Sequence, residues 1–295
     1  MMLSLSRRSM TRVASSVAQD TPPRGVGELS VGLQRTDYRK AVERPGIPEA
    51  ETQSDPWLYS VAGAIYLSDE IAIYGGYTRG LEESGVAPSS AANRDEPLPA
   101  ILTSQRDAGL RWAITPDLRA VLGLFDVRKP YFQLDTDNVF RLLGEQRHRG
   151  IEFSLSGQIS PLLSVVAGLV LLRPRVRGAD VDAGLVGQLP VGQPARNVQI
   201  NADWQLPWLD GLSLDMGITH LSRRAATRDN IVFLPARTQI NIGGRYRFDL
   251  GGRPAAVRLA ISNLTDEYGF DLRGASGSYD IIDGRVARLS LSVDF

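Results

Sequence analysis

The sequence predicts an all-β protein, folded as one antiparallel β-barrel of about twelve strands. Three observations predict this fold class. Apolar and polar residues alternate with a period of two in one segment after another, from about residue 27 to Phe295, and two is the side-chain period of a β-strand. The connections between these segments are alternately long and short. No convincing amphipathic helix lies between them, so strands alone make up the predicted fold.

The individual strands are defined by their alternation and by the turn residues between them. The predicted strands cover residues 27–38, 57–67, 71–81, 101–114, 118–129, 139–159, 162–173, 197–206, 212–221, 237–248, 255–264 and 284–295. Short turns join every second pair, for example at Thr115-Pro116-Asp117, where the proline fixes φ. The long connections cover residues 39–56, 82–99, 129–138, 174–193, 222–230 and 265–283.

The two faces of these strands predict where the barrel lies. In the last twelve residues, GRVARLSLSVDF, apolar side chains alternate with Arg, Ser and Asp. So many polar residues would be unusual in the core of a soluble β-sandwich, which is the second interpretation. In a transmembrane barrel the apolar face meets lipid and the polar face lines a wet lumen. Val166 and Val170 fit poorly, because they are predicted to face the lumen.

Composition narrows the class of protein further. The longest apolar run, Leu162 to Leu172, is far shorter than the ~20 residues of a spanning helix, so a membrane protein of this sequence must be a barrel. The formal net charge is zero, which argues against a nucleic-acid partner. The chain has no cysteine, which excludes disulfides, thiolate metal sites and cysteine nucleophiles.

The first residues do not continue the pattern. A secretory signal peptide needs an apolar core, and Arg7, Arg8 and Arg12 stand where that core would lie. We therefore expect two regions, an irregular and poorly ordered amino-terminal segment at residues 1–26 and a barrel at residues 27–295.

Seven segments, in their order and spacing, carry a resemblance to a known family. They are IAIYGGYTRG, LTSQRDAGLRW, LFDVRKPYF, QRHRGIEFSLSGQIS, LPARTQINIGGRYRF, AISNLTDEYG and the terminal RLSLSVDF. Together they resemble the carboxy-terminal part of a TonB-dependent outer-membrane receptor of the ferric-siderophore type, over about residues 27–295. One departure is small: Asp107 stands where the family usually has Glu.

The resemblance implies energy-coupled uptake of a ferric siderophore across the cell outer membrane. The siderophore brings its own iron ligands, so no cofactor and no metal site in the protein is expected. The family also has a signal peptide, a TonB box, a plug and about twenty-two strands. We expect this chain to be the carboxy-terminal part of such a barrel, without plug domain or TonB box, and inactive in uptake by itself.

Ferric siderophores are commonly anionic, so the resemblance implies ligand contacts from Arg and aromatic side chains in the outer loops and lumen. The candidates are Arg173, Arg175, Arg177, Arg223, Arg224, Arg228, Tyr131 and Phe132. The simpler interpretation of any one of these arginines is a general surface role, because outer loops are charged and all basic residues except Lys40 and Lys129 are Arg.

The sequence offers no catalytic constellation. His148 and His220 are the only histidines, and neither has a persuasive Ser or Asp partner. A twelve-stranded outer-membrane hydrolase, which would need such a pair, is therefore disfavoured. An autotransporter-type translocator or an outer-membrane pore stays open as the alternative function; a translocator would need a helix in the pore and a passenger upstream.

The final strand implies further partners. Its apolar residues Leu289, Leu291 and Val293, with the terminal Phe295, resemble the signal that the barrel assembly machinery reads. The expected partners are this machinery, outer-membrane lipid and a ferric siderophore. The TonB complex is a partner only if a plug and a TonB box exist in the full-length gene.

Overall fold

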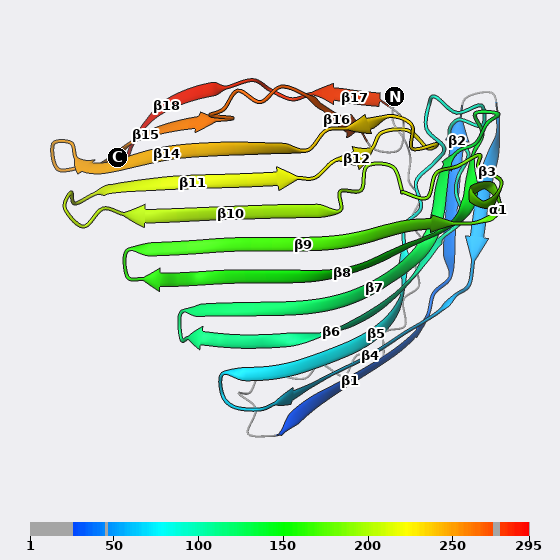
Figure 1. Ribbon diagram of the computed structural model, residues 1–295, viewed down its shortest axis with the longest axis horizontal. Coiled ribbons are helices and arrows are strands. Elements are labelled where there is room, and N and C mark those ends of the chain that lie inside the picture. Colours follow the sequence, from blue (N-terminus) through cyan, green and yellow to red (C-terminus); the bar gives the residue numbers. More distant parts are fainter. Residues whose placement is uncertain (1–25, 45–46, 274–277, 295) are drawn as a thin grey trace.

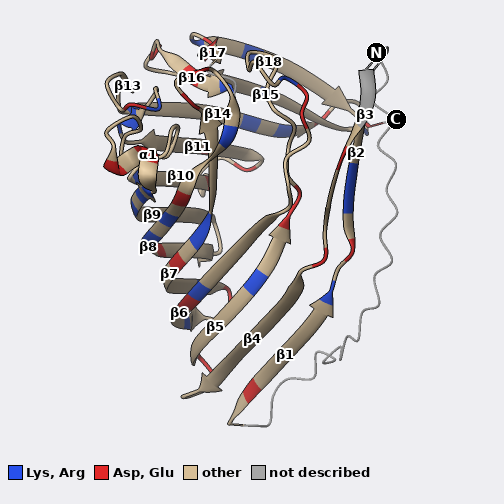
Figure 2. Cartoon of the chain, turned by 90° about the vertical axis from the view of Figure 1, so that its right-hand side faces the viewer, with Lys and Arg blue, Asp and Glu red and all other residues tan. Residues whose placement is uncertain are grey.

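The computed structural model describes residues 26–44, 47–273 and 278–294, and within them the chain is nearly all β. Twelve antiparallel strands form one sheet in the order β1-β4-β5-β6-β7-β8-β9-β10-β11-β14-β15-β18. Apart from β1 and β18, each strand pairs with the strand of this sheet that comes before it in the chain and with the one that comes after it. The sheet curves into an open trough, with β1 and β18 at its two edges (Figures 1 and 2). The predicted all-β antiparallel fold is confirmed.

The strands of this sheet differ widely in length. They are β1 (Gly27–Arg35), β4 (Trp57–Tyr66), β5 (Ile71–Glu82), β6 (Ile101–Thr115), β7 (Leu118–Leu134), β8 (Phe140–Ser160), β9 (Leu163–Arg177), β10 (Arg196–Gln205), β11 (Leu212–Leu221), β14 (Arg237–Asp249), β15 (Pro254–Ser262) and β18 (Val286–Val293). The longest, β8, has 21 residues, whereas β10 and β11 have 10 each.

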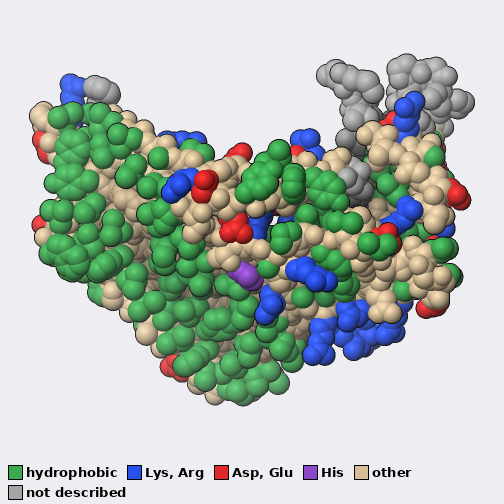
Figure 3. All heavy atoms as spheres, turned by 45° about the horizontal axis from the view of Figure 1, so that its top comes forward, with side chains coloured by type: hydrophobic (Ala, Val, Ile, Leu, Met, Phe, Trp, Pro, Cys, Tyr) green, Lys and Arg blue, Asp and Glu red, His purple; other side chains and the backbone are tan. Residues whose placement is uncertain are grey.

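The register of the sheet separates an apolar face from a polar one. Directly paired residues share a face, and the row that runs from Leu110 through Leu122 and Phe153 to Leu169 is apolar throughout. The next residue along β8, Ser154, lies in a row with Val121 and Gly168 on the other face. The apolar face is the convex one, and Figure 3 shows its hydrophobic side chains as a broad band, called the apolar belt below.

The polar face is concave. It carries residues such as Asn201, Asp203 and Asp215 in adjoining rows across β10 and β11. Val166 lies in the same row as Asn201 and is 58% exposed, so it faces the lumen side as predicted.

Long connections lie at one end of the trough and tight turns at the other (Figure 1). The long ones contain small elements that the sequence pattern did not predict. These are the pairs β2 (Tyr38–Arg44) with β3 (Ile47–Ser54), β12 (Arg224–Ala225) with β13 (Phe233–Leu234) and β16 (Phe270–Arg273) with β17 (Ser278–Ile281), and the helix α1 (Ala179–Asp182).

Two predicted connections are in part strand. Residues 129–138 were predicted as a connection, but β7 continues to Leu134 and pairs there with Phe140. The connection predicted from Pro174 begins later, because β9 continues to Arg177, which pairs with Glu145. Strands β7, β8 and β9 therefore extend beyond the apolar belt toward the loop end of the molecule.

These extensions are held by two small hydrophobic cores. In one, Tyr131, Leu143, Val176 and Val186 are buried together; in the other, Phe132 and Leu134 pack against Phe140 and the loop residues Ala87, Ala91 and Leu98. Burial of these side chains against the loops after β5 and β9 stabilises the strand ends beyond the apolar belt.

Within the described residues the sheet does not close, since β1 and β18 have no partner on their outer sides. No helix among these residues has the length and apolar character needed to cross a membrane. The predicted irregular segment at residues 1–26 lies, apart from Val26, outside the described residues, as does Phe295 of the predicted assembly signal. Leu289 and Leu291 are 71% and 61% exposed on the convex face.

Candidate ligand-binding site on the concave face

A pocket opens on the concave face near the loop end of β14, β15 and β18. Its volume is about 540 Å³. It is called the concave pocket below and is lined by Arg237, Gln239, Asn241, Ala260, Ser262, Asn263, Asp271, Asp280, Ile281, Ile282, Asp283, Gly284, Val286 and Arg288. Three sheet strands supply the floor, and the hairpin of β16 and β17 supplies the rim.

Two arginines meet one carboxylate at this pocket. Arg224 Nη2 donates to Asp271 Oδ1 at 2.6 Å, and Arg237 Nη2 donates to Asp271 Oδ2 at 2.8 Å. Burial by itself would raise the pKa of Asp271, but the hydrogen bonds and charges of Arg237 and Arg224 outweigh it and lower that pKa. The carboxylate stays ionised and compensates one of the two cationic charges.

The arginine pair keeps donors to spare. Arg224 is 4% exposed, and its Nη1 has no hydrogen-bond partner among the described residues. Arg237 Nε is likewise buried without an acceptor there. A buried guanidinium donor without an acceptor is costly, and the charge-assisted bonds that Arg forms best are those to anionic oxygens. The pair is therefore suited to an anionic ligand.

Asn263 places the hairpin over the pocket. Its φ is +50°, a left-handed conformation that Asn adopts more readily than most residues. Its Nδ2 donates to the carbonyls of Glu267 and Asp283 at 2.9 and 3.0 Å, and its Oδ1 accepts from the Glu267 amide at 2.8 Å. One side chain thus ties both ends of the connection between β15 and β18 together.

The predicted ligand residues that follow β11 make contacts with other residues of the protein. Arg224 adjoins the concave pocket through its bond to Asp271, but it is not one of the residues that line the pocket. Arg223 stacks on Phe233, with its Cζ 3.9 Å from the ring centroid. Arg228 Nη1 donates to the carbonyl of Leu134 at 3.1 Å and also to that of Asp135, so it ties this loop to the end of β7.

The predicted aromatic ligands lie inside the small hydrophobic cores. Tyr131 is 5% exposed, and Phe132 packs against the core that contains Phe140. The sequence placed both in an exposed connection. The structure places them in the buried end of β7, because the strand continues and the neighbouring loops fold against it.

Arg173, Arg175 and Arg177 were predicted in an outer loop and lie instead in β9. Their rows continue the face of Leu171 and Leu169, so all three point to the convex side, away from the lumen. The structure does not bring them together with Arg224 or with the concave pocket.

Arg237 and Arg288 were not among the predicted ligand residues. The signal that would have found them is the alternation itself, because both fall on the polar parity of their strands near the long connections. Neither predicted histidine forms a catalytic pair: His220 Nδ1 lies 2.8 Å from Thr238 Oγ1, and His148 Nε2 has no partner among the described residues.

Comparison with known proteins identifies the class of barrel. A family model described as TonB dependent receptor-like, beta-barrel, matches residues 26–264. Among curated proteins, the chain is similar to the ferrichrome receptor FcuA of Yersinia enterocolitica, with 24% identity over 277 residues, which are 90% of this chain and 36% of FcuA.

Solved structures agree. The ferric preacinetobactin receptor BauA from Acinetobacter baumannii matches with a TM-score of 0.75 and 27% identity over 92% of this chain and 40% of BauA. The siderophore receptor PiuA from the same organism matches with a TM-score of 0.73 and 18% identity over 92% of this chain and 41% of PiuA, which shows the fold alone. The chain thus spans about two fifths or less of the length of these relatives, which are named as receptors and not as enzymes.

Proposed function

This chain belongs to the TonB-dependent receptor family, and from that membership we propose that it forms part of the wall of an outer-membrane barrel that receives ferric siderophores. The apolar belt would lie in the lipid of the outer membrane, and the concave face would line the passage. The long connections would then face the exterior and the tight turns the periplasm.

The observation that carries the proposal is the concave pocket with its arginine pair. Arg224 and Arg237 share one carboxylate and retain unpaired donors, and Arg288 adds a further cation on the same wall. Two more carboxylates line the rim: Asp280, which pairs with Arg273 at 3.7 Å, and Asp283. Such a site suits an anionic chelate that approaches from the loop end. Of the residues predicted from sequence, we propose that Arg224 supports the site from behind by holding Asp271. Arg223, Arg228, Tyr131 and Phe132 would shape the loops around the pocket.

The two free edges bear on what the chain does alone. An unpaired strand edge leaves backbone N–H and C=O groups without partners, which lipid does not tolerate. We propose that β1 and β18 are paired with further strands in the functional barrel, and that this chain alone does not carry out TonB-coupled uptake. The apolar residues Leu289, Leu291 and Val293 would be the part of β18 that the barrel assembly machinery recognises.

A binding titration tests the proposed ligand class. The full chain in detergent is titrated with ferrichrome and with ferric preacinetobactin, and quenching of the tryptophan fluorescence is recorded. We expect one chelate to bind, and Arg237→Gln combined with Arg288→Gln to weaken it about tenfold to a hundredfold through lost charge-assisted hydrogen bonds.

Arg247→Gln is the matched control, because Arg247 lies on the concave side of the same strand, β14, but outside the pocket. It should leave the affinity unchanged. If the double variant binds as tightly as the original chain, or if the folded chain binds neither chelate, the proposed site is wrong.

A further inference from the structure

Arginines gather on the convex face just beyond the apolar belt. Two successive cross-strand rows follow the last apolar row, one running Arg173, Arg149, Asp126, Arg106 and Tyr77, the other Arg175, Arg147, Arg128, Ser104 and Arg79. The seven arginines of these rows are called the arginine band. Figure 3 shows a cluster of basic side chains at the loop-side end of the hydrophobic surface.

The band carries far more positive than negative charge. Its one carboxylate, Asp126, is shared: Arg147 Nε donates to it at 2.7 Å and Arg149 Nε at 3.2 Å. Arg128 adds an ion pair at 4.0 Å. Among the described residues, no carboxylate lies within ion-pair distance of Arg173 or Arg175, and both are exposed. The band therefore presents guanidinium groups that the protein itself does not neutralise.

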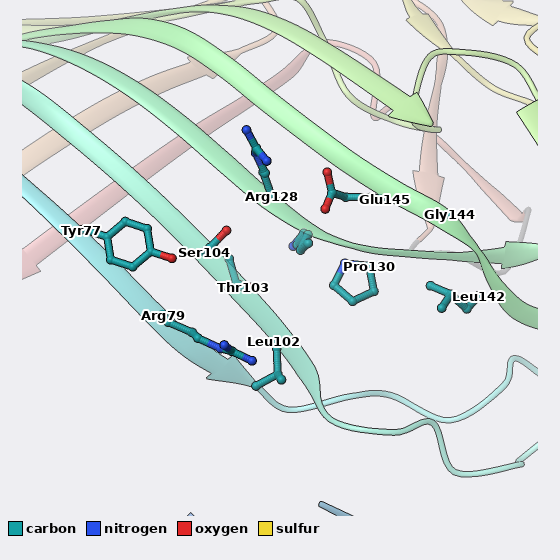
Figure 4. Close-up of a pocket in the computed structure, with 11 residues that line it drawn as sticks. Tyr77, Arg79, Leu102, Thr103, Ser104, Arg128, Pro130, Leu142, Gly144 and Glu145 are labelled. Atoms are coloured by element: carbon teal, nitrogen blue, oxygen red, sulfur yellow. The ribbon is translucent and has the colours of Figure 1, made fainter. Parts of the chain in front are cut away.

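A groove lies within the band. It has a volume of about 520 Å³, and strands β5 to β8 form its walls (Figure 4). Arg79, Arg128 and Lys129 supply cationic groups, Glu145 is the one carboxylate of the lining, and Leu102, Leu142 and Pro130 supply apolar surface. The combination is that of a site for an amphipathic molecule with an anionic end, and only the row of Arg106 and Asp126 separates the row of Arg128 from the apolar belt.

We propose that the arginine band and this groove bind the phosphorylated headgroup of an outer-leaflet lipid, whose acyl chains cover the apolar belt. The proposal rests on the proposed function, since it needs the belt to lie in a membrane. Arginine is the residue best matched to phosphate oxygens, because its planar fork donates two parallel hydrogen bonds. A soluble anion would gain only the headgroup contacts, whereas the lipid also gains the adjoining apolar surface.

Lipid retention in micelles tests the proposal. The full chain in dodecyl maltoside is mixed with dimyristoyl phosphatidic acid or with dimyristoyl phosphatidylcholine, and bound lipid is counted by native mass spectrometry. We expect preferential retention of phosphatidic acid, and a roughly tenfold weaker affinity for it in the variant Arg149→Gln/Arg173→Gln/Arg175→Gln, from the loss of charge-assisted hydrogen bonds.

The control removes the same charge from the other face. Arg119→Gln/Arg247→Gln/Arg258→Gln changes three arginines of concave parity and should retain the lipid. The variant Arg149→Lys/Arg173→Lys/Arg175→Lys keeps the charge but loses the planar fork, so its affinity should lie between those of the original chain and the convex Gln variant, which separates loss of charge from loss of folding. Equal loss in both Gln variants, unchanged binding in the convex one, or displacement of the lipid by millimolar inorganic phosphate would overturn the proposal.

Chelate titration of the same samples separates this proposal from the proposed function. The tryptophan fluorescence of the variant Arg149→Gln/Arg173→Gln/Arg175→Gln should still be quenched by the chelate that the original chain binds. Lipid retention without chelate binding would remove the siderophore proposal and leave the lipid site, and the reverse result would remove the lipid site alone.

Discussion

At the scale of single residues, one tyrosine shows how the concave face is packed. Tyr74 of β5 crosses the two neighbouring strands. A Cβ built on Gly109 would lie 2.6 Å from its hydroxyl oxygen and would clash with the carbonyl oxygen of Leu122. A Cβ on Gly123 would lie 2.8 Å from the carboxylate of Glu152 and 3.1 Å from the same hydroxyl. Arg111 stacks on the ring, with its Cζ 4.7 Å from the centroid. The two glycines therefore make room for a side chain that joins three strands.

Gly109→Ala is expected to destabilise the sheet by about 1–3 kcal/mol, because the added methyl group forces Tyr74 or the backbone to shift. Gly168→Ala is the matched control, since nothing lies within 4 Å of a Cβ at this strand glycine. Thermal unfolding in detergent measures both. Equal melting temperatures for the two variants would show that Tyr74 accommodates the methyl group without cost.

At the scale of the strand, the alternation makes neighbouring residues differ in kind. Phe153 of β8 lies between Leu122 and Leu169 on the apolar belt, and Ser154 beside it lies on the concave face. Phe153→Arg would place a charge in lipid at a cost of about 2–4 kcal/mol near the bilayer centre, whereas Ser154→Arg stays in a polar lumen.

Folding yield into lipid vesicles compares the two substitutions. We expect Phe153→Arg to lower the yield and the urea midpoint strongly, and Ser154→Arg to leave both close to the original values. A similar loss for both variants would mean that the two faces of β8 are not lipid and lumen.

The strands also show how much of the fold can be predicted from the sequence. Period-two alternation located all twelve sheet strands, because an apolar face and a polar face repeat along each. It missed the ends of β7 and β9, because the polarity of the two faces reverses there. Arg173 and Arg175 continue the parity of the convex face, whereas Pro174 and Val176 are buried on the other face. A strand prediction that assumes one constant apolar face therefore stops where the strand extends beyond the apolar belt.

The candidate site was less accessible to sequence reasoning than the strands. The contact of Arg224 with Asp271 joins residues 47 positions apart, through two short hairpins that no periodic pattern marks. The sequence predicted the type of residue, an arginine in an outer loop. Arg237 and Arg288 could be assigned to the pocket only from the structure, because they come together when β14 and β18 pair with the two sides of β15.

At the scale of the whole molecule, the open sheet makes a direct prediction. If β1 and β18 are edges, cysteines placed on them should not form a disulfide, and the natural chain has no cysteine to interfere. We expect no cross-link when Val31→Cys is combined in turn with Leu289→Cys, Leu291→Cys or Val293→Cys. Leu259→Cys with Leu289→Cys, a directly paired couple in β15 and β18, is the positive control.

Gel mobility gives the second measurement on the same samples. A chain that stays open should lack the compact, boiling-sensitive band of a closed barrel. A compact band together with a β1–β18 disulfide would show that twelve strands close on themselves, and the proposal that further strands pair with these edges would then fail.

The unequal strand lengths shape the way into the lumen. Strand β8 has 11 residues more than β10, and at about 3.3 Å per residue its additional length is on the order of 36 Å along the strand. The wall of the trough is therefore tall at β7 to β9 and lower from β10 onward. The concave pocket lies at the loop ends of β14, β15 and β18, where the wall is lower. Under the proposed function, an incoming chelate would therefore reach the pocket over this lower part of the wall, past the hairpin of β16 and β17.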